Sequence, residues 1–322
     1  MIRKGNFTFL SSDGKTTISG RTWAPEDGSA KGVVQLVHGM VEHILRYDAF
    51  AQFLADNGFL VVGHDHLGHG ESVQTEQDHG FFGKDPCALL VKDIHKVRTH
   101  FQKEGQPYFI LGHSMGSFLL RVYLAQYGEG LSGAIIMGTG YMPANTIRLA
   151  MLAANAEGLI RGERHRSTLL QQLSYGAPYK RYDVTGKDHK NSWLTKDEGI
   201  VQKYFSDKKC GFVFTVNGYK GLFESVRDSC SPESIAKIPK ALPILLNAGS
   251  EDPVGDLGKG VRTVERLFRE AGIRDVTCTI YEGDRHEILN ENDREQVYRD
   301  ILEWLAARMG APAEETSDTR TE

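Results

Sequence analysis

The sequence predicts an α/β fold in which a mostly parallel, doubly wound sheet carries an inserted helical cap. Short apolar runs rich in β-branched residues recur along the chain and alternate with longer amphipathic segments. Continuous apolar runs are typical of strands buried on both faces of a parallel sheet. Their alternation with helices indicates a doubly wound architecture. The alternation stops near residue 141 and is absent to about residue 220, which indicates an insertion.

The expected elements follow in chain order. A half-exposed strand is expected at 16–25, because polar and apolar residues alternate there. Buried strands are expected at 31–39, 59–66, 108–114, 131–138, 242–249 and 276–283. Helices are expected at 44–58, 88–105, 118–130, 258–272 and 293–310. Several of these end in glycine after a charged last turn, which is a common helix stop.

The interruption divides the chain into a core and a cap. Residues 1–141 and 216–310 are assigned to the core, 142–215 to the cap, and 311–322 to a polar tail that is expected to be disordered. An apolar, helix-forming segment opens the cap. Its side chains either line a channel for an acyl chain or pack on the core, and the sequence does not decide between these. They are Ile147, Leu149, Met151, Leu152, Leu159 and Ile160.

Composition excludes several classes of protein. The 322 residues carry a formal net charge of −4 with no basic stripe, so no nucleic-acid partner is expected. The four cysteines are scattered without a C-x-x-C pair, which favours reduced thiols in a cytoplasmic protein. No signal peptide is expected from the N-terminal residues, and no apolar run is long enough to span a membrane.

The motif with the sharpest chemical meaning is G-x-S-x-G at residues 112–116. It follows an expected buried strand and precedes an expected helix, which is the context of a nucleophile elbow. Such a turn exposes its serine at the edge of the sheet, so Ser114 is the candidate nucleophile. A glycine-rich turn without chemistry is the alternative interpretation.

A nucleophilic serine needs a base, and the base needs an orienting acid, in the chain order Ser, Asp or Glu, His. His286 is the candidate base, because the other downstream histidines, at 165 and 189, fall within the cap. Asp252 is the candidate acid, because it lies a short turn beyond the strand at 242–249. Asp256 is the fallback.

The stretch VHGMVEH, residues 37–43, follows the first buried strand and fits an oxyanion loop. Two backbone amides must face the oxyanion of a tetrahedral intermediate. We expect them to come from Met40 and from Met115, the residue after the nucleophile. His38 and His43 are then expected to hold the loop by hydrogen bonds.

Two other stretches resemble binding sites but each lacks an essential residue. His64, His66 and His69 form an H-x-H-x-x-H spacing that zinc could use, but the aspartate of the metallohydrolase pattern is replaced by Gly68. The G-T-G sequence at 138–140 lacks the third glycine of a dinucleotide-binding loop. We therefore expect neither a metal nor a cofactor.

With these residues in place, the chain resembles the monoacylglycerol lipase and lysophospholipase branch of the α/β-hydrolases. The matching pieces are HGMVEH, RYDAFAQFLADNGF, DHLGHGES, GHSMG, GSEDPV and YEGDRHEIL, in family order over about residues 8–308. The resemblance implies a triad of Ser114, Asp252 and His286, and oxyanion amides from Met40 and Met115. It also implies a cap over the acyl pocket and no cofactor.

The expected function is hydrolysis of carboxylic esters, monoacylglycerols or similar lipid esters above all, through an acyl-enzyme on Ser114. The same triad would serve a short-chain or aryl carboxylesterase, an amidase, a peptidase or a thioesterase, because the pocket and not the triad discriminates these. A binding protein that keeps the fold is a third class. Transient contact of the cap with a membrane surface and the oligomeric state are left open by the sequence.

Overall fold

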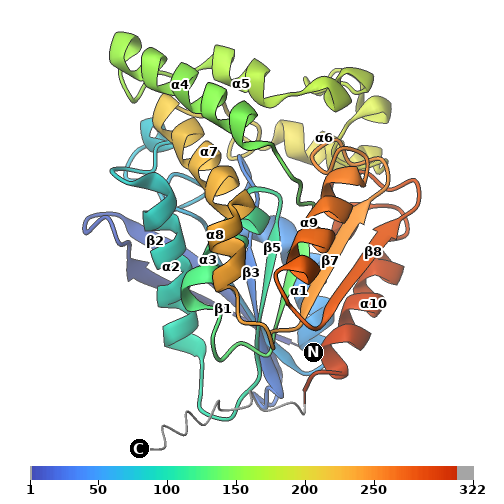
Figure 1. Ribbon diagram of the computed structural model, residues 1–322. Helices are drawn as coiled ribbons and strands as arrows, with labels where there is room; N and C mark the ends of the chain where they lie inside the picture. Colours follow the sequence, from blue (N-terminus) through green and yellow to red (C-terminus); the bar gives the residue numbers. More distant parts are fainter. Residues whose placement is uncertain (1, 310–322) are drawn as a thin grey trace, which may run out of the picture.

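The computed structural model describes residues 2–309, in which eight strands form one sheet of order β1-β2-β4-β3-β5-β6-β7-β8 (Figure 1). The β1–β2 and β2–β4 pairs are antiparallel, and the other five pairs are parallel. The expected parallel sheet is thus confirmed. The strands are β1 (Ile2–Leu10), β2 (Thr17–Pro25), β3 (Gly32–Val37), β4 (Phe59–His64), β5 (Tyr108–His113), β6 (Gly133–Met137), β7 (Ile244–Gly249) and β8 (Val276–Tyr281).

Two layers of helices cover the sheet. One face packs on α1 (Asp48–Asp56) and α10 (Arg294–Ala306). The other packs on α2 (Pro86–Phe101), α3 (Met115–Tyr127), α8 (Pro232–Lys237) and α9 (Lys259–Glu270). All five expected helices of the core are present. Burial of both faces explains why β3, β5, β6 and β7 are continuous apolar runs with every residue buried.

The first strand, β1, was not expected from the sequence. Its residues alternate between exposed and half-buried, and only Phe7 and Phe9 give it an apolar side. The Phe7 ring lies over Gly20 of β2, where a Cβ atom would come within 2.2 Å of it. An edge strand of this kind carries a weak pattern because only one side of it is covered.

The insertion follows β6 and lies across the carboxyl ends of the parallel strands (Figure 1). It contains α4 (Ala144–Arg161), α5 (Thr168–Ser174) and α6 (Glu198–Ser206), with 3₁₀ turns at Ala177–Arg181 and His189–Asn191. The chain returns through α7 (Val216–Cys230), which packs against α2, α3 and α4. The remaining 3₁₀ turns are Ile44–Tyr47, Glu76–Asp78 and Ile288–Asn290.

The six apolar side chains of α4 were expected either to line an acyl channel or to pack on the core. Both expectations are wrong for most of the six. Ile147 is buried, but four of the six are exposed: Leu149, Leu152, Leu159 and Ile160. None of the six lines the main cavity described below. The tail expected at 311–322 lies outside the described residues. No helix within residues 2–309 is both long and apolar enough to cross a membrane.

Candidate active site

The candidate site lies where the parallel strands end. Val37 of β3 pairs with Gly112 of β5, and His113 of β5 pairs with Met137 of β6. The loops that follow these strands therefore leave the sheet side by side. The loops after β7 and β8 leave from the same edge, which brings chain segments far apart in sequence to one place.

Ser114 occupies a strained turn between β5 and α3. Its backbone has φ 54° and ψ −123°, a region that residues other than glycine rarely adopt. The flanking glycines make the turn possible. A Cβ on Gly112 would come within 2.4 Å of the Gly116 carbonyl oxygen, and one on Gly116 within 2.1 Å of the Val37 oxygen. Both glycines are needed because strand, turn and helix approach so closely.

The structure brings Asp252 and His286 together. Both carboxylate oxygens of Asp252 lie 3.0 Å from Nδ1 of His286, and both side chains are buried. Asp252 also accepts a hydrogen bond of 2.8 Å from the Val254 amide, which fixes its carboxylate. The carboxylate thus orients the ring and leaves Nε2 as its free nitrogen. Asp256, the fallback, does not contact His286 but lies elsewhere in the cavity wall.

His286 faces the cavity that Ser114 also lines. Its Nε2 is buried and has no hydrogen-bond partner among residues 2–309. The ring fits because the neighbouring position is Gly138, where a Cβ would approach Cε1 of His286 to 3.0 Å. The free nitrogen is the atom that a general base needs to present to a reacting group.

The loop after β3 lies directly beside the serine. A Cβ on Gly39 would come within 3.0 Å of the Ser114 Cβ, so the loop passes as near as backbone can. Met40 and Met115 both line the cavity with Ser114. Met115 is the first residue of α3, and a helix leaves the amides of its first turn without an intrahelical acceptor.

The expected role of His38 as a scaffold is confirmed. Its Nδ1 lies 2.8 Å from the Gly39 oxygen, and its Nε2 accepts a hydrogen bond from the His66 amide at 2.9 Å. The ring is therefore neutral with its proton on Nδ1, and burial lowers its pKa. His43 pairs with Asp207, a residue of the insertion.

The rival zinc ligands do not form a metal site. His66 packs on His38 and His64 as a ring cluster, with centroid distances of 4.2 and 5.1 Å. Burial lowers the pKa of His64 to about 3, so this ring is neutral. Within residues 2–309, the one group of metal-binding side chains close enough to share an ion lies elsewhere.

A buried cluster of charged side chains supports the loop beside Ser114. Glu42 accepts hydrogen bonds from the Gly39 amide at 2.5 Å and from the Tyr47 hydroxyl at 2.8 Å. Arg46 binds Glu42 at 2.5 Å and Glu287 through two bonds of 2.7 and 2.6 Å. Because Glu287 follows the candidate base, the cluster connects the loop after β3 to the loop that carries His286.

The cluster also fixes the protonation of His113, the residue before the serine. The single hydroxyl proton of Tyr47 goes to Glu42, so Nδ1 of His113 must donate to the Tyr47 oxygen 2.9 Å away. Nε2 lies 3.2 Å from the His286 carbonyl oxygen, which can only accept. His113 is therefore an imidazolium, and with Arg46 it balances the two carboxylates of Glu42 and Glu287.

The pKa shifts agree with this charge balance. Burial alone would lower the pKa of His113, but the nearby carboxylates of Glu42, 3.6 Å from its Nδ1, and of Glu287 raise it. Burial alone would raise the pKa of Glu42, but Arg46 and His113 hold it well below the usual value. No role was predicted from the sequence for Glu42, Arg46, His113 or Glu287. The only signal was their closeness in sequence to the predicted site residues.

The insertion completes the cavity, which has a volume of about 380 Å³. Trp193 stacks on the His286 ring at a centroid distance of 4.9 Å and an interplanar angle of 30°. A backbone hydrogen bond also joins the segment around Trp193 to the loop that carries His286, because the Glu287 amide donates to the Leu194 oxygen at 2.7 Å. Apolar side chains dominate the rest of the wall: Phe118, Met142, Leu173, Leu222, Phe223 and Val226.

The fold and the serine turn define this chain as an α/β-hydrolase with a serine-centred site. Residues 28–293 match the hydrolase family described as serine aminopeptidase, S33, and the chain belongs to this family. It is 25% identical to a monoacylglycerol lipase of Mycolicibacterium smegmatis, over 89% of this chain and 92% of that protein. It is 28% identical to the monoglyceride lipase of Homo sapiens, over 89% of this chain and 86% of that protein.

Solved structures show the same similarity. A thermostable carboxyl esterase from Bacillus coagulans, solved in complex with glycerol, superposes with a TM-score of 0.85. The two sequences are 29% identical, and the match covers 96% of this chain and all of that one. The similarity therefore includes the insertion as well as the sheet.

Proposed function

We propose that this protein is a serine hydrolase that cleaves carboxylic esters of lipids, with monoacylglycerols as the leading substrate class. One observation carries the proposal: the strained Ser114 and the Asp252–His286 pair open onto a single, mostly apolar cavity roofed by the insertion. The names of the similar lipases and the esterase support this substrate class. No cofactor is needed for this chemistry.

In the proposed reaction, His286 Nε2 takes the hydroxyl proton of Ser114 as its oxygen attacks the ester carbonyl. The amides of Met40 and Met115 donate to the oxyanion of the tetrahedral intermediate. The carbonyl–oxygen bond to the alcohol then breaks, and His286 returns the proton to the leaving alcohol. Water repeats these steps on the acyl-enzyme and releases the fatty acid. Asp252 keeps the His286 ring oriented and stabilises its charged form.

We propose residues 142–215 as the cap that shapes the substrate pocket. Leu173 of α5 both lines the cavity and is 54% exposed, so an apolar path leads from the surface into the pocket. Four more apolar side chains are exposed on α4, a helix in contact with α5. Leu159 and Ile160 are 90% and 82% exposed, which favours transient contact of the cap with a lipid surface. A cytoplasmic location fits the four unpaired thiols.

A second candidate function is that of a short-chain or aryl carboxylesterase. It is favoured by the similarity to the carboxyl esterase and by a cavity near the lower end of the usual range of roughly 300–1,000 Å³ for ligand pockets. Such an enzyme would use the same serine, acid and base. Amide and thioester substrates would differ only in the leaving group.

A substrate panel tests the proposal. We expect kcat/KM to peak at medium or long monoacylglycerols, against matched alkyl and aryl esters, a lysophospholipid, a thioester and an amino-acid arylamide. Ser114→Ala provides the blank for each substrate. A preference for short or aryl esters, with glycerides ignored, would move the protein to the second candidate function. A preference for the arylamide would contradict both.

A further inference from the structure

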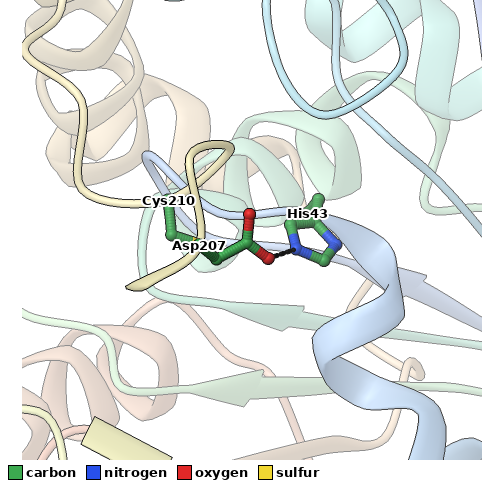
Figure 2. Close-up of side chains that lie close together, drawn as sticks. All are labelled: His43, Asp207 and Cys210. Atoms are coloured by element: carbon green, nitrogen blue, oxygen red, sulfur yellow. Dashed lines mark hydrogen bonds and ion pairs between the residues drawn. The ribbon is translucent and has the colours of Figure 1, made fainter. Parts of the chain in front are cut away.

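A second group of reactive side chains lies beside the oxyanion loop, outside the candidate active site (Figure 2). His43 comes from the loop after β3, whereas Asp207 and Cys210 come from the turn after α6. Nε2 of His43 lies 2.9 Å from Oδ2 of Asp207. One ligand atom from each of the three residues lies within 4.8 Å of the other two. The proposed reaction uses none of the three.

The three groups are zinc ligands by chemical type. Imidazole nitrogen, carboxylate oxygen and thiolate sulfur bind Zn²⁺ at roughly 2.0–2.3 Å, and three protein ligands with one water make an open tetrahedral site. At such bond lengths the ligand atoms lie about 3.5 Å apart. The most distant pair of ligand atoms, at no more than 4.8 Å, would therefore close to about 3.5 Å, and the His43–Asp207 pair would open slightly from 2.9 Å.

The thiol supplies the second observation. The Cys210 side chain is 92% buried and makes no hydrogen bond to any residue in 2–309, yet its sulfur lies beside the His43–Asp207 pair. Its other polar neighbours are already paired. Arg46 binds Glu42 and Glu287, and Lys209 binds Glu71. Lys208, the other cation of this turn, is exposed to solvent.

We propose that His43, Asp207 and Cys210 bind one borderline-soft divalent cation, with Zn²⁺ or Cd²⁺ as the best match. The Cys210 thiol loses its proton to solvent as the metal–sulfur bond forms. His43 moves its Nε2 proton to Nδ1, so that the Nε2 lone pair binds the metal. The metal takes the place of that proton between His43 and Asp207, and water fills the fourth position. Burial raises the pKa of the Cys210 thiol, so binding strengthens as the pH rises.

The location gives the site a consequence for catalysis, which rests on the proposed function. His43 is three residues beyond Met40, and the Gly211 amide already donates to the Val41 oxygen at 2.9 Å. A metal ion would replace the existing His43–Asp207 bond between the loop after β3 and the insertion and would add Cys210 to that connection. Because the ligands must move together to bind it, we expect the loop to shift and the reaction of Ser114 to slow.

Cadmium binding to the metal-free full-length protein tests the site without using activity. We expect one equivalent of Cd²⁺ to produce the ultraviolet charge-transfer band of a cadmium–thiolate bond. Cys210→Ser and Cys210→Ala should both remove the band and weaken binding at least tenfold, and His43→Asn should weaken it similarly. Cys87→Ser is the matched control, because Cys87 is also a buried free thiol but has no histidine ligand beside it, and should change nothing.

Two results of the cadmium titration would overturn the site: a band that survives both Cys210 variants, or several equivalents of Cd²⁺ bound without any band. If the metal binds as proposed, Zn²⁺ is expected to slow fluorophosphonate labelling of Ser114 at least threefold in the wild type and not in Cys210→Ala. If Ser114 does not label at all, the proposed function fails while the cadmium result still decides the metal site.

Discussion

At the scale of single residues, Ser114 combines function with backbone strain. For a residue other than glycine, a backbone conformation of φ 54° and ψ −123° costs roughly 1–3 kcal/mol of conformational strain. Glycine adopts this conformation freely. Such strain persists only where the surrounding structure enforces it. Here the enforcement comes from Gly112 and Gly116, whose missing side chains let β5 and α3 meet at the turn.

This strain predicts that glycine at position 114 abolishes activity but gives a more stable protein than alanine does. Ser114→Ala and Ser114→Gly should both lower kcat by several orders of magnitude, because each removes the nucleophile. Ser114→Gly should nevertheless unfold at a higher denaturant concentration than Ser114→Ala, by about 1 kcal/mol after the greater chain entropy of glycine is subtracted. Urea unfolding of the two inactive variants measures this difference. An unstrained turn would instead make Ser114→Gly less stable than Ser114→Ala, by the roughly 0.4–1 kcal/mol of glycine's greater chain entropy.

His113 predicts a pH dependence of stability. Its pKa is raised in the folded protein, so the folded state holds a proton that the unfolded state releases near pH 6.5. The stabilisation is complete below pH 6.5 and is lost as the pH rises through the raised pKa. His113→Gln should remove this part of the pH dependence. Urea unfolding of both proteins from pH 6 to 9 checks it, and parallel curves would contradict a protonated His113.

At the scale of elements, the insertion contacts the proposed catalytic residues directly as well as covering them. The segment around Trp193 lies on the histidine loop through ring stacking and through the Glu287–Leu194 backbone bond. The Thr195 hydroxyl adds a bond of 3.0 Å to the Asn290 oxygen in the same loop. The position of His286 therefore depends on residues of the cap as well as on Asp252.

Trp193 should consequently affect kcat more than KM. Its ring face can stabilise the imidazolium that forms during acyl transfer by about 0.5–2 kcal/mol, which corresponds to roughly 2- to 30-fold in rate. Trp193→Leu should lower kcat within that range, and Trp193→Phe should restore most of it. Steady-state kinetics with a soluble ester measures both. Trp304→Leu is the control, because Trp304 is equally buried but packs in the core between the sheet and the layer of α1 and α10. This substitution should lower stability and leave kcat unchanged.

The same scale shows what sequence could predict. The strands that are buried on both faces were found because burial makes them continuous apolar runs. The triad candidates were found because their order along the chain is restrictive. The charge cluster was not found, since Arg46 and Glu287 are 241 positions apart and neither carries a local pattern. The side chains of α4 were misplaced because an apolar helix that faces solvent looks the same in sequence as one that faces a core.

At the scale of the whole molecule, α4 lies at the end of the insertion far from the sheet (Figure 1), and four of its apolar side chains are exposed. Such a surface is costly to keep in water unless it meets another apolar phase. It would place the opening near Leu173 against a lipid surface, from which a poorly soluble ester could enter directly.

This arrangement predicts a division between two substrates. Replacing Leu159 and Ile160 together with glutamine should weaken binding to phosphatidylcholine vesicles at least tenfold, because burial of each side chain in lipid contributes on the order of 1 kcal/mol or more. Hydrolysis of a soluble short-chain ester should stay within twofold of the wild type. Vesicle sedimentation and a soluble-ester assay check the two halves, and unchanged sedimentation would contradict lipid contact by this surface.

The central claim is that Ser114 is a nucleophile activated by His286 and Asp252. The most direct measurement is to label the intact protein with a fluorophosphonate and locate the adduct by peptide mass spectrometry. We expect one adduct, on Ser114, that is absent in Ser114→Ala and forms at least a hundredfold more slowly in His286→Ala. An adduct on another residue, or labelling that His286→Ala leaves unchanged, would contradict the account.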